Sequence, residues 1–120
     1  MFKDWQQMEK SLSGDLRSLR AGAPEVMKGF GALAQAALKA DALEGRTKEL
    51  IALAIAVATR CDGAIAFHAE AALKRGASRA EVLETMGMAI YMGAGPNVLA
   101  AAEALEAFDQ FAKHDAAKAT

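Results

Sequence analysis

The sequence lacks several features that mark other classes of protein. It has one cysteine in 120 residues, which argues against a secreted scaffold held together by disulfides. Its longest apolar run, Leu50 to Ala58, is far below the ~20 residues that a membrane-spanning helix needs. The 14 basic and 15 acidic residues are interspersed and leave a formal net charge of -1, so the charge gives no reason to expect nucleic acid or an anionic membrane as a partner.

The N-terminus also lacks a targeting pattern. The segment Met1 to Trp5 does not have the basic-then-apolar order of a signal peptide. We therefore expect a cytoplasmic protein that acts on a small molecule or contacts another protein. A chain of 120 residues with 53% hydrophobic residues is long enough to form a single domain over residues 1–120 and to bury a core without a disulfide.

Apolar residues recur at helical spacing along the chain, and no segment alternates as a strand would. A first helix, ended by Gly22 and Pro24, carries an apolar stripe at steps of three and four: Phe2, Trp5, Met8, Leu12, Leu16 and Leu19. A second helix follows Pro24 and carries Met27, Phe30, Leu33, Ala37 and Leu38. A third, from Thr47 to Arg60, is apolar on nearly every face, so we expect it to be central and surrounded.

Three further helices complete the prediction. The fourth runs from about Asp62 to Arg75 and stops at Gly76, a residue suited to the left-handed conformation after a helix. The spacing of Ser78 and Glu81 is that of a capping box, so the fifth begins near Arg79 and breaks at Gly93 to Pro96. The sixth ends near Lys113, with Val98, Leu105 and Phe108 among its inward residues. The fold class is all-α, a single-domain six-helix bundle.

Such a bundle has more apolar surface than one small core covers. Each predicted helix has an apolar stripe, and the third has almost no polar face. Excess apolar surface of this kind marks subunit contacts. We therefore expect a symmetric homo-oligomer.

The residues that carry chemistry gather around the fourth helix. At about 100° per residue, Cys61, Ala64 and His68 fall on one face, with His68 one turn beyond position 64. If the third and fourth helices form a hairpin that turns near Arg60, the carboxylate of Glu49 approaches the imidazole and raises its basicity. Carboxylate, imidazole and thiol together follow the logic of an activated nucleophile.

These residues, with Lys48 to Ile51 before them and Tyr91 to Pro96 after them, resemble the alkylhydroperoxidase D-like branch of the carboxymuconolactone decarboxylase family over about residues 25–110. The spacing Glu, eleven residues, Cys, two residues, Cys, three residues, His is specific to that branch, and only the second cysteine is missing here. The resemblance implies an all-helical fold, trimers or hexamers, and reduction of peroxides by a cysteine pair without a metal or flavin cofactor.

The resemblance also implies roles for individual residues. Glu49 and His68 correspond to the proton-relay pair, and Cys61 to the thiol that resolves the intermediate. Ala64 stands where the attacking thiol belongs. The implied partners are a small-molecule hydroperoxide and a dithiol reductant such as lipoamide. Because the attacking thiol is absent, we expect little or no two-cysteine peroxidase turnover, either because the chain is an engineered cysteine-to-alanine variant or because it is a natural one-cysteine form.

Two other functions stay open at this point. Related lactone decarboxylases work without the cysteine pair, so His68 and Glu49 could serve as acid and base of a cofactor-free lyase. The chain could also be a non-catalytic oligomeric binding module, in which Cys61 is an inert residue. A metal site is not expected, because one cysteine and one histidine seven residues apart do not supply a coordination shell.

Overall fold

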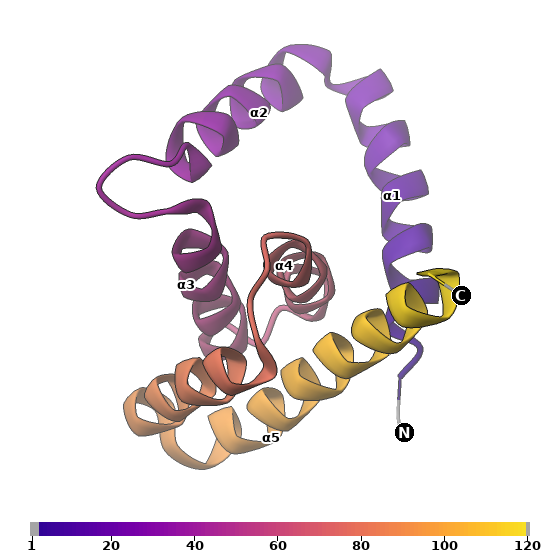
Figure 1. Ribbon diagram of the computed structural model, residues 1–120. Coiled ribbons are helices and arrows are strands. Elements are labelled where there is room, and N and C mark those ends of the chain that lie inside the picture. Colours follow the sequence, from indigo (N-terminus) through magenta and orange to yellow (C-terminus); the bar gives the residue numbers. More distant parts are fainter. Residues whose placement is uncertain (1–2, 120) are drawn as a thin grey trace.

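The computed structural model describes residues 3–119, and every regular element in that range is helical. The five helices are α1 (Trp5–Gly22), α2 (Pro24–Leu38), α3 (Gly45–Ala58), α4 (Asp62–Lys74) and α5 (Arg79–Ala119). Figure 1 shows α1 and α2 as two outer sides of a frame that surrounds α4. Phe2, which the sequence places on the first apolar stripe, lies outside the described residues.

A tight turn joins α3 to α4. Arg60 adopts the left-handed conformation, with φ 53°, and the backbone N–H of Cys61 donates to the carbonyl of Ala56 at 3.0 Å. The N–H of Arg60 donates to Val57 at 3.1 Å. This pair of bonds satisfies carbonyl groups at the end of α3. The reversal at this turn lets α3 and α4 pack together as a hairpin, as the sequence predicts.

The boundaries of α4 and α5 follow the predicted signals. Gly76 is left-handed, with φ 88°, and ends α4 as expected. At the start of α5, the backbone N–H of Ser78 donates to Glu81 Oε1 at 2.8 Å, and the N–H of Glu81 donates to Ser78 Oγ at 3.1 Å. The capping box is therefore formed from both sides.

The break predicted between the fifth and sixth helices lies inside α5, which consists of two helical segments on either side of a kink. Within α5 only Ala94 has non-helical dihedrals, φ 54° and ψ -139°. The side chain of Asn97 bridges the break, because its Nδ2 donates to the carbonyl of Ala89 at 2.8 Å. A Cβ atom at Gly93 would overlap this Asn97 side chain. The break thus takes up a single residue. Residues 3–119 are divided into five helices and not six because α5 includes the segments on both sides of this break.

The core lies between α3, α4 and α5. It is built mainly from alanines and a few larger side chains: Leu53, Val57, Ile65, Val82, Met86, Phe108 and Phe111. Trp5, in the first turn of α1, is fully buried and also belongs to this core. Its Nε1 donates to Glu106 Oε1 at 2.9 Å, and its backbone N–H donates to Gln110 Oε1 at 2.9 Å. These bonds fix the start of α1 against α5.

Three expectations about the core are wrong for a single chain. α2 has no buried residue, and Phe30 and Leu33 are 61% and 62% exposed. α3 is not surrounded, because Ile51 and Ile55 are 44% and 57% exposed. Val98 is also exposed. The periodicity identified apolar faces correctly, but it could not say which faces a single copy covers.

None of the helices between residues 3 and 119 is long and apolar enough to cross a membrane.

Candidate active site

The best-defined polar contact in the core joins α3 to α4. Glu49 Oε1 lies 2.7 Å from Nδ1 of His68. The Glu49 side chain is 5% exposed, whereas the His68 side chain is 23% exposed. The hairpin therefore holds a buried carboxylate behind an imidazole that reaches the surface. The sequence predicted that these two residues would meet, and the structure brings them together.

The contact decides which histidine nitrogen is available for chemistry. With Glu49 ionised, Nδ1–H donates to the carboxylate, and this tautomer leaves Nε2 as the basic nitrogen. A carboxylate behind the ring also stabilises the imidazolium that forms when Nε2 takes a proton. This arrangement leaves Nε2 as the ring nitrogen that is not engaged with Glu49.

Ala64 lies next to this pair. It is four residues before His68 on α4, so the two side chains are neighbours on one helix face. Ala64 is partly buried and packs against the core. A methyl group therefore occupies the position from which a side chain could exchange a proton with His68.

Cys61 lies at the edge of the site. It is the N-cap of α4, in an extended conformation, and its thiol is free and exposed. Its backbone carbonyl accepts from the N–H of Ile65 at 2.9 Å, so it is joined to the first turn of α4. Cys61 is not an inert cysteine of the core, because it is accessible to solvent.

Phe67 lies beside the site but was not among the site residues predicted from the sequence. Its ring is 5.3 Å from the His68 ring, centroid to centroid, in an edge-to-face arrangement at 78°. Phe67 is 55% exposed, so it forms an apolar rim beside the imidazole. Its place next to His68 on an apolar helix was the available signal.

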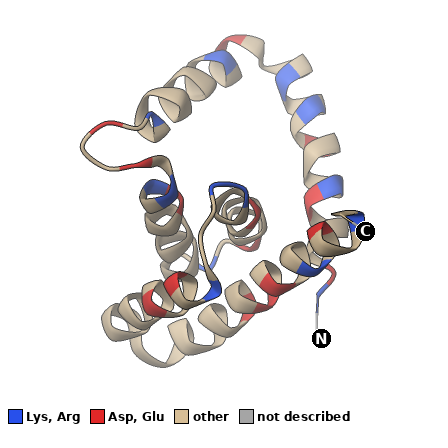
Figure 2. Cartoon of the chain, viewed as in Figure 1, with Lys and Arg blue, Asp and Glu red and all other residues tan. Residues whose placement is uncertain are grey.

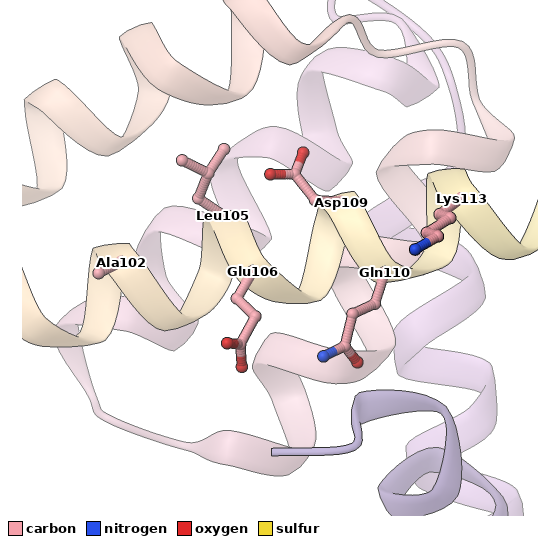
Figure 3. Close-up of a pocket in the computed structure, with 6 residues that line it drawn as sticks. All are labelled: Ala102, Leu105, Glu106, Asp109, Gln110 and Lys113. Carbon is pink, nitrogen blue, oxygen red and sulfur yellow. The ribbon is translucent and has the colours of Figure 1, made fainter. Parts of the chain in front are cut away.

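The pocket shown in Figure 3 lies elsewhere. It is a groove of about 400 Å³ along α5, lined by Ala102, Leu105, Glu106, Asp109, Gln110 and Lys113. Several polar groups there already have partners. Asp109 Oδ1 accepts from Arg79 Nε at 3.0 Å, and Glu106 and Gln110 hold Trp5. None of the four predicted site residues lines this groove. Within residues 3–119, no group of three or more His, Cys, Asp or Glu side chains could hold a metal ion.

The all-helical fold of this domain agrees with the comparisons to known proteins. The model of the carboxymuconolactone decarboxylase family matches residues 24–107. The chain belongs to this family.

Relatives of similar length support this membership. An uncharacterized protein of Cupriavidus necator is 37% identical over 109 residues, covering 91% of this chain and 96% of the relative. Uncharacterized protein 4 in the cox locus of Paracoccus denitrificans is 36% identical over 91 residues, covering 76% of this chain and 81% of the relative. The crystal structure of a carboxymuconolactone decarboxylase family protein from Legionella pneumophila, in its apo form, has 51% identity and a TM-score of 0.88, and covers 89% of this chain and 96% of that one.

Proposed function

We propose that the chain is a cytoplasmic, thiol-dependent hydroperoxide reductase scaffold of the alkylhydroperoxidase D type, impaired because Ala64 replaces the attacking cysteine. The observation that carries the proposal is the 2.7 Å contact between Glu49 and His68, with position 64 one turn before the imidazole. A general base paired with a buried carboxylate is the machinery that activates a thiol. A free, exposed Cys61 fits a reducing compartment.

The proposed chemistry needs a thiol at position 64. His68 Nε2 takes the thiol proton, and the thiolate attacks the terminal oxygen of a hydroperoxide. The S–O bond forms, the O–O bond breaks, and the alcohol leaves with a proton returned by His68. Cys61 then attacks the sulfenic sulfur, forming a disulfide and releasing water. A dithiol such as dihydrolipoamide reduces this disulfide and is itself oxidised to a cyclic disulfide, so the two electrons that reduce the hydroperoxide come from the dithiol.

The direct test is to restore the thiol. Ala64→Cys should consume a hydroperoxide in the presence of a dithiol, whereas the unchanged chain should not exceed background. Ala64→Ser is the matched control, since it has similar size and no thiol. In the Ala64→Cys background, His68→Ala should lower turnover by about 10²–10⁴-fold through loss of acid–base catalysis. Normal turnover by the unchanged chain, or none by Ala64→Cys, would contradict the proposal.

A second candidate follows from the position of Cys61. The thiol lies at the N-cap, outside α4, while the Glu49–His68 pair is complete without it. Such a pair could serve as the acid and base of a cofactor-free lyase on a carboxylate-bearing substrate. Cys61→Ser separates the two functions, because a lyase activity of the unchanged chain would survive it, whereas the reductase activity restored by Ala64→Cys would be lost.

We also propose that the chain forms a homo-oligomer, a trimer or a hexamer. The accessible surface of one chain is 7625 Å², whereas a compact monomer of this mass exposes about 6,200 Å². The excess of about 1,400 Å² exceeds the ~800 Å² per partner of a standard interface. Large apolar side chains account for much of the exposure on α2, α3 and α5, among them Phe30, Ile55, Met88, Tyr91, Met92 and Leu99.

A further inference from the structure

One side of α2 is apolar and uncovered. Val26, Phe30 and Leu33 are 72%, 61% and 62% exposed, and with Ala37 they form a line at steps of four, three and four. We call this line the α2 stripe. An isolated helix of about 12–15 residues is marginal in water, so α2 requires packing that its own chain does not provide.

The chain's own contacts hold the α2 stripe away from its core. The half-buried residues of α2 are Met27, Ala34 and Leu38, which lie on a different side of the helix. Lys48 Nζ, from α3, donates to the carbonyls of Ala37 and Lys39 at 2.9 and 2.6 Å. The end of α2 is thereby tied to the start of α3, and within residues 3–119 the large side chains of the stripe remain mostly exposed.

A second apolar surface borders the candidate active site. Ile55 of α3 and Phe67 of α4 are 57% and 55% exposed, and three partly exposed alanines lie on the same two helices: Ala52, Ala64 and Ala71. We call these five residues the site rim. Two large exposed side chains and three alanine methyl groups thus form an apolar surface beside the imidazole, of the kind against which an apolar helix packs. None of the five residues is charged.

We propose that the α2 stripe of a second copy packs into the site rim and closes the Glu49–His68 site, so that each site is shared by two copies. The stripe supplies large side chains, Phe30 and Leu33, where the rim offers alanines. The proposal rests on the homo-oligomer proposed above, and the occupant is a second copy because one chain exposes more surface than a standard interface needs.

This packing explains how a solvent-accessible imidazole could work as a base. In one copy His68 is 23% exposed, and Phe67 shields only one edge of the ring. A neighbouring helix over the rim would exclude bulk water from Nε2 and strengthen the electrostatic coupling to Glu49. Phe30 and Leu33 of the second copy would then also limit the shape of the substrate.

The test uses the two histidines of the chain, His68 and His114. His114 is exposed near the end of α5 and serves as an internal reference. Mass by light scattering and carbethoxylation of each histidine by diethyl pyrocarbonate, read by mass spectrometry, are measured for the unchanged chain and for Phe30→Glu. Phe30→Glu should lower the mass to 12.6 kDa and raise the rate at His68 several-fold relative to His114.

Ala32→Glu is the matched control, because Ala32 is exposed on the side of α2 opposite Phe30 and receives the same charge. It should keep both the mass and the His68 rate of the unchanged chain. Circular dichroism checks that each variant is helical, and Phe30→Ala replaces Phe30→Glu if the latter unfolds. A monomeric unchanged chain would overturn the assembly. An assembly that survives both Phe30→Glu and Phe30→Ala would overturn the shared site, as would an assembly that dissociates without a faster reaction at His68. Either outcome leaves the homo-oligomer and the proposed activity standing.

Discussion

Two regions of the molecule differ in how much of their apolar surface they bury. The first region is α3, α4 and α5, and the second is α1 and α2. The first three bury alanines, Leu53, Val57 and Ile65 against one another. The other two contribute a single fully buried residue, Trp5. Figure 2 shows charged residues in both regions, along α1 and at the start of α3 as well as on α5, so the presence of charge alone does not explain the contrast. The difference teaches that apolar periodicity predicts a buried face without identifying the molecule that buries it.

The largest effect should come from paired truncations in the two regions. Leu53→Ala, at a fully buried residue of α3, should lower the free energy of unfolding by about 2–5 kcal/mol through lost contacts and a cavity. Leu33→Ala, on α2, should change it by about 0.5 kcal/mol or less in the separated chain and by more in the assembly. Urea unfolding at low and high protein concentration measures both. A large, concentration-independent effect of Leu33→Ala would erase the contrast between the regions.

A smaller effect is expected at the break in α5. A methyl group at Gly93 would overlap the Asn97 side chain, which must then release the carbonyl of Ala89. Gly93→Ala should therefore lower the free energy of unfolding by about 1–3 kcal/mol, the usual cost of overpacking. The thermal midpoint of unfolding reports this loss, and Gly87→Ala, where a Cβ meets nothing within 4 Å, is the control. Equal midpoints for the two variants would mean that Asn97 does not hold the break.

Relief of backbone strain should act in the opposite direction. Ala94 has φ 54° and ψ -139°, a conformation that costs a residue with a Cβ atom about 1–3 kcal/mol. Ala94→Gly removes this strain but adds conformational entropy to the unfolded chain, so the net gain in stability should be about 1 kcal/mol. Chemical denaturation measures it. A loss of stability would show that the Ala94 methyl contributes packing.

The smallest effect on stability is expected where α1, of the second region, contacts α4, of the first. Burial raises the pKa of Glu9 to about 7, and a hydrogen bond with Glu70 of α4 adds to this. Because the folded state holds this proton more tightly than the unfolded chain, stability is full below the ordinary pKa of about 4.5 and falls as the pH rises towards 7. Thermal midpoints from pH 4 to 8 should show this slope, and Glu9→Gln should reduce it. An unchanged slope in Glu9→Gln would assign it to other groups.

Much of the local structure could be predicted from the sequence, because its signals act over a few residues. Gly76 and the pair Ser78 and Glu81 fix helix ends through their own backbone bonds. The meeting of Glu49 and His68 could also be predicted, because a short turn after an apolar helix leaves a hairpin as the simplest path.

Other features could not be predicted from the sequence alone. The pattern Gly93 to Pro96 predicts the break in α5, but it does not predict that Ala94 alone makes the break or that the Asn97 side chain bonds to the carbonyl of Ala89 across it. The exposure of Phe30 depends on tertiary packing, which periodicity does not report. The place of Phe67 next to His68 in the sequence indicates proximity, but the edge-to-face contact of the two rings depends on side-chain positions that the sequence does not give.

The position of Cys61 limits what oxidation can do to this protein. It carries the only thiol in the sequence, and that thiol is exposed at the start of α4. No bridge within one molecule is possible, so an oxidant can couple this sulfur only to a separate thiol, either a small one from solution or its counterpart in another copy.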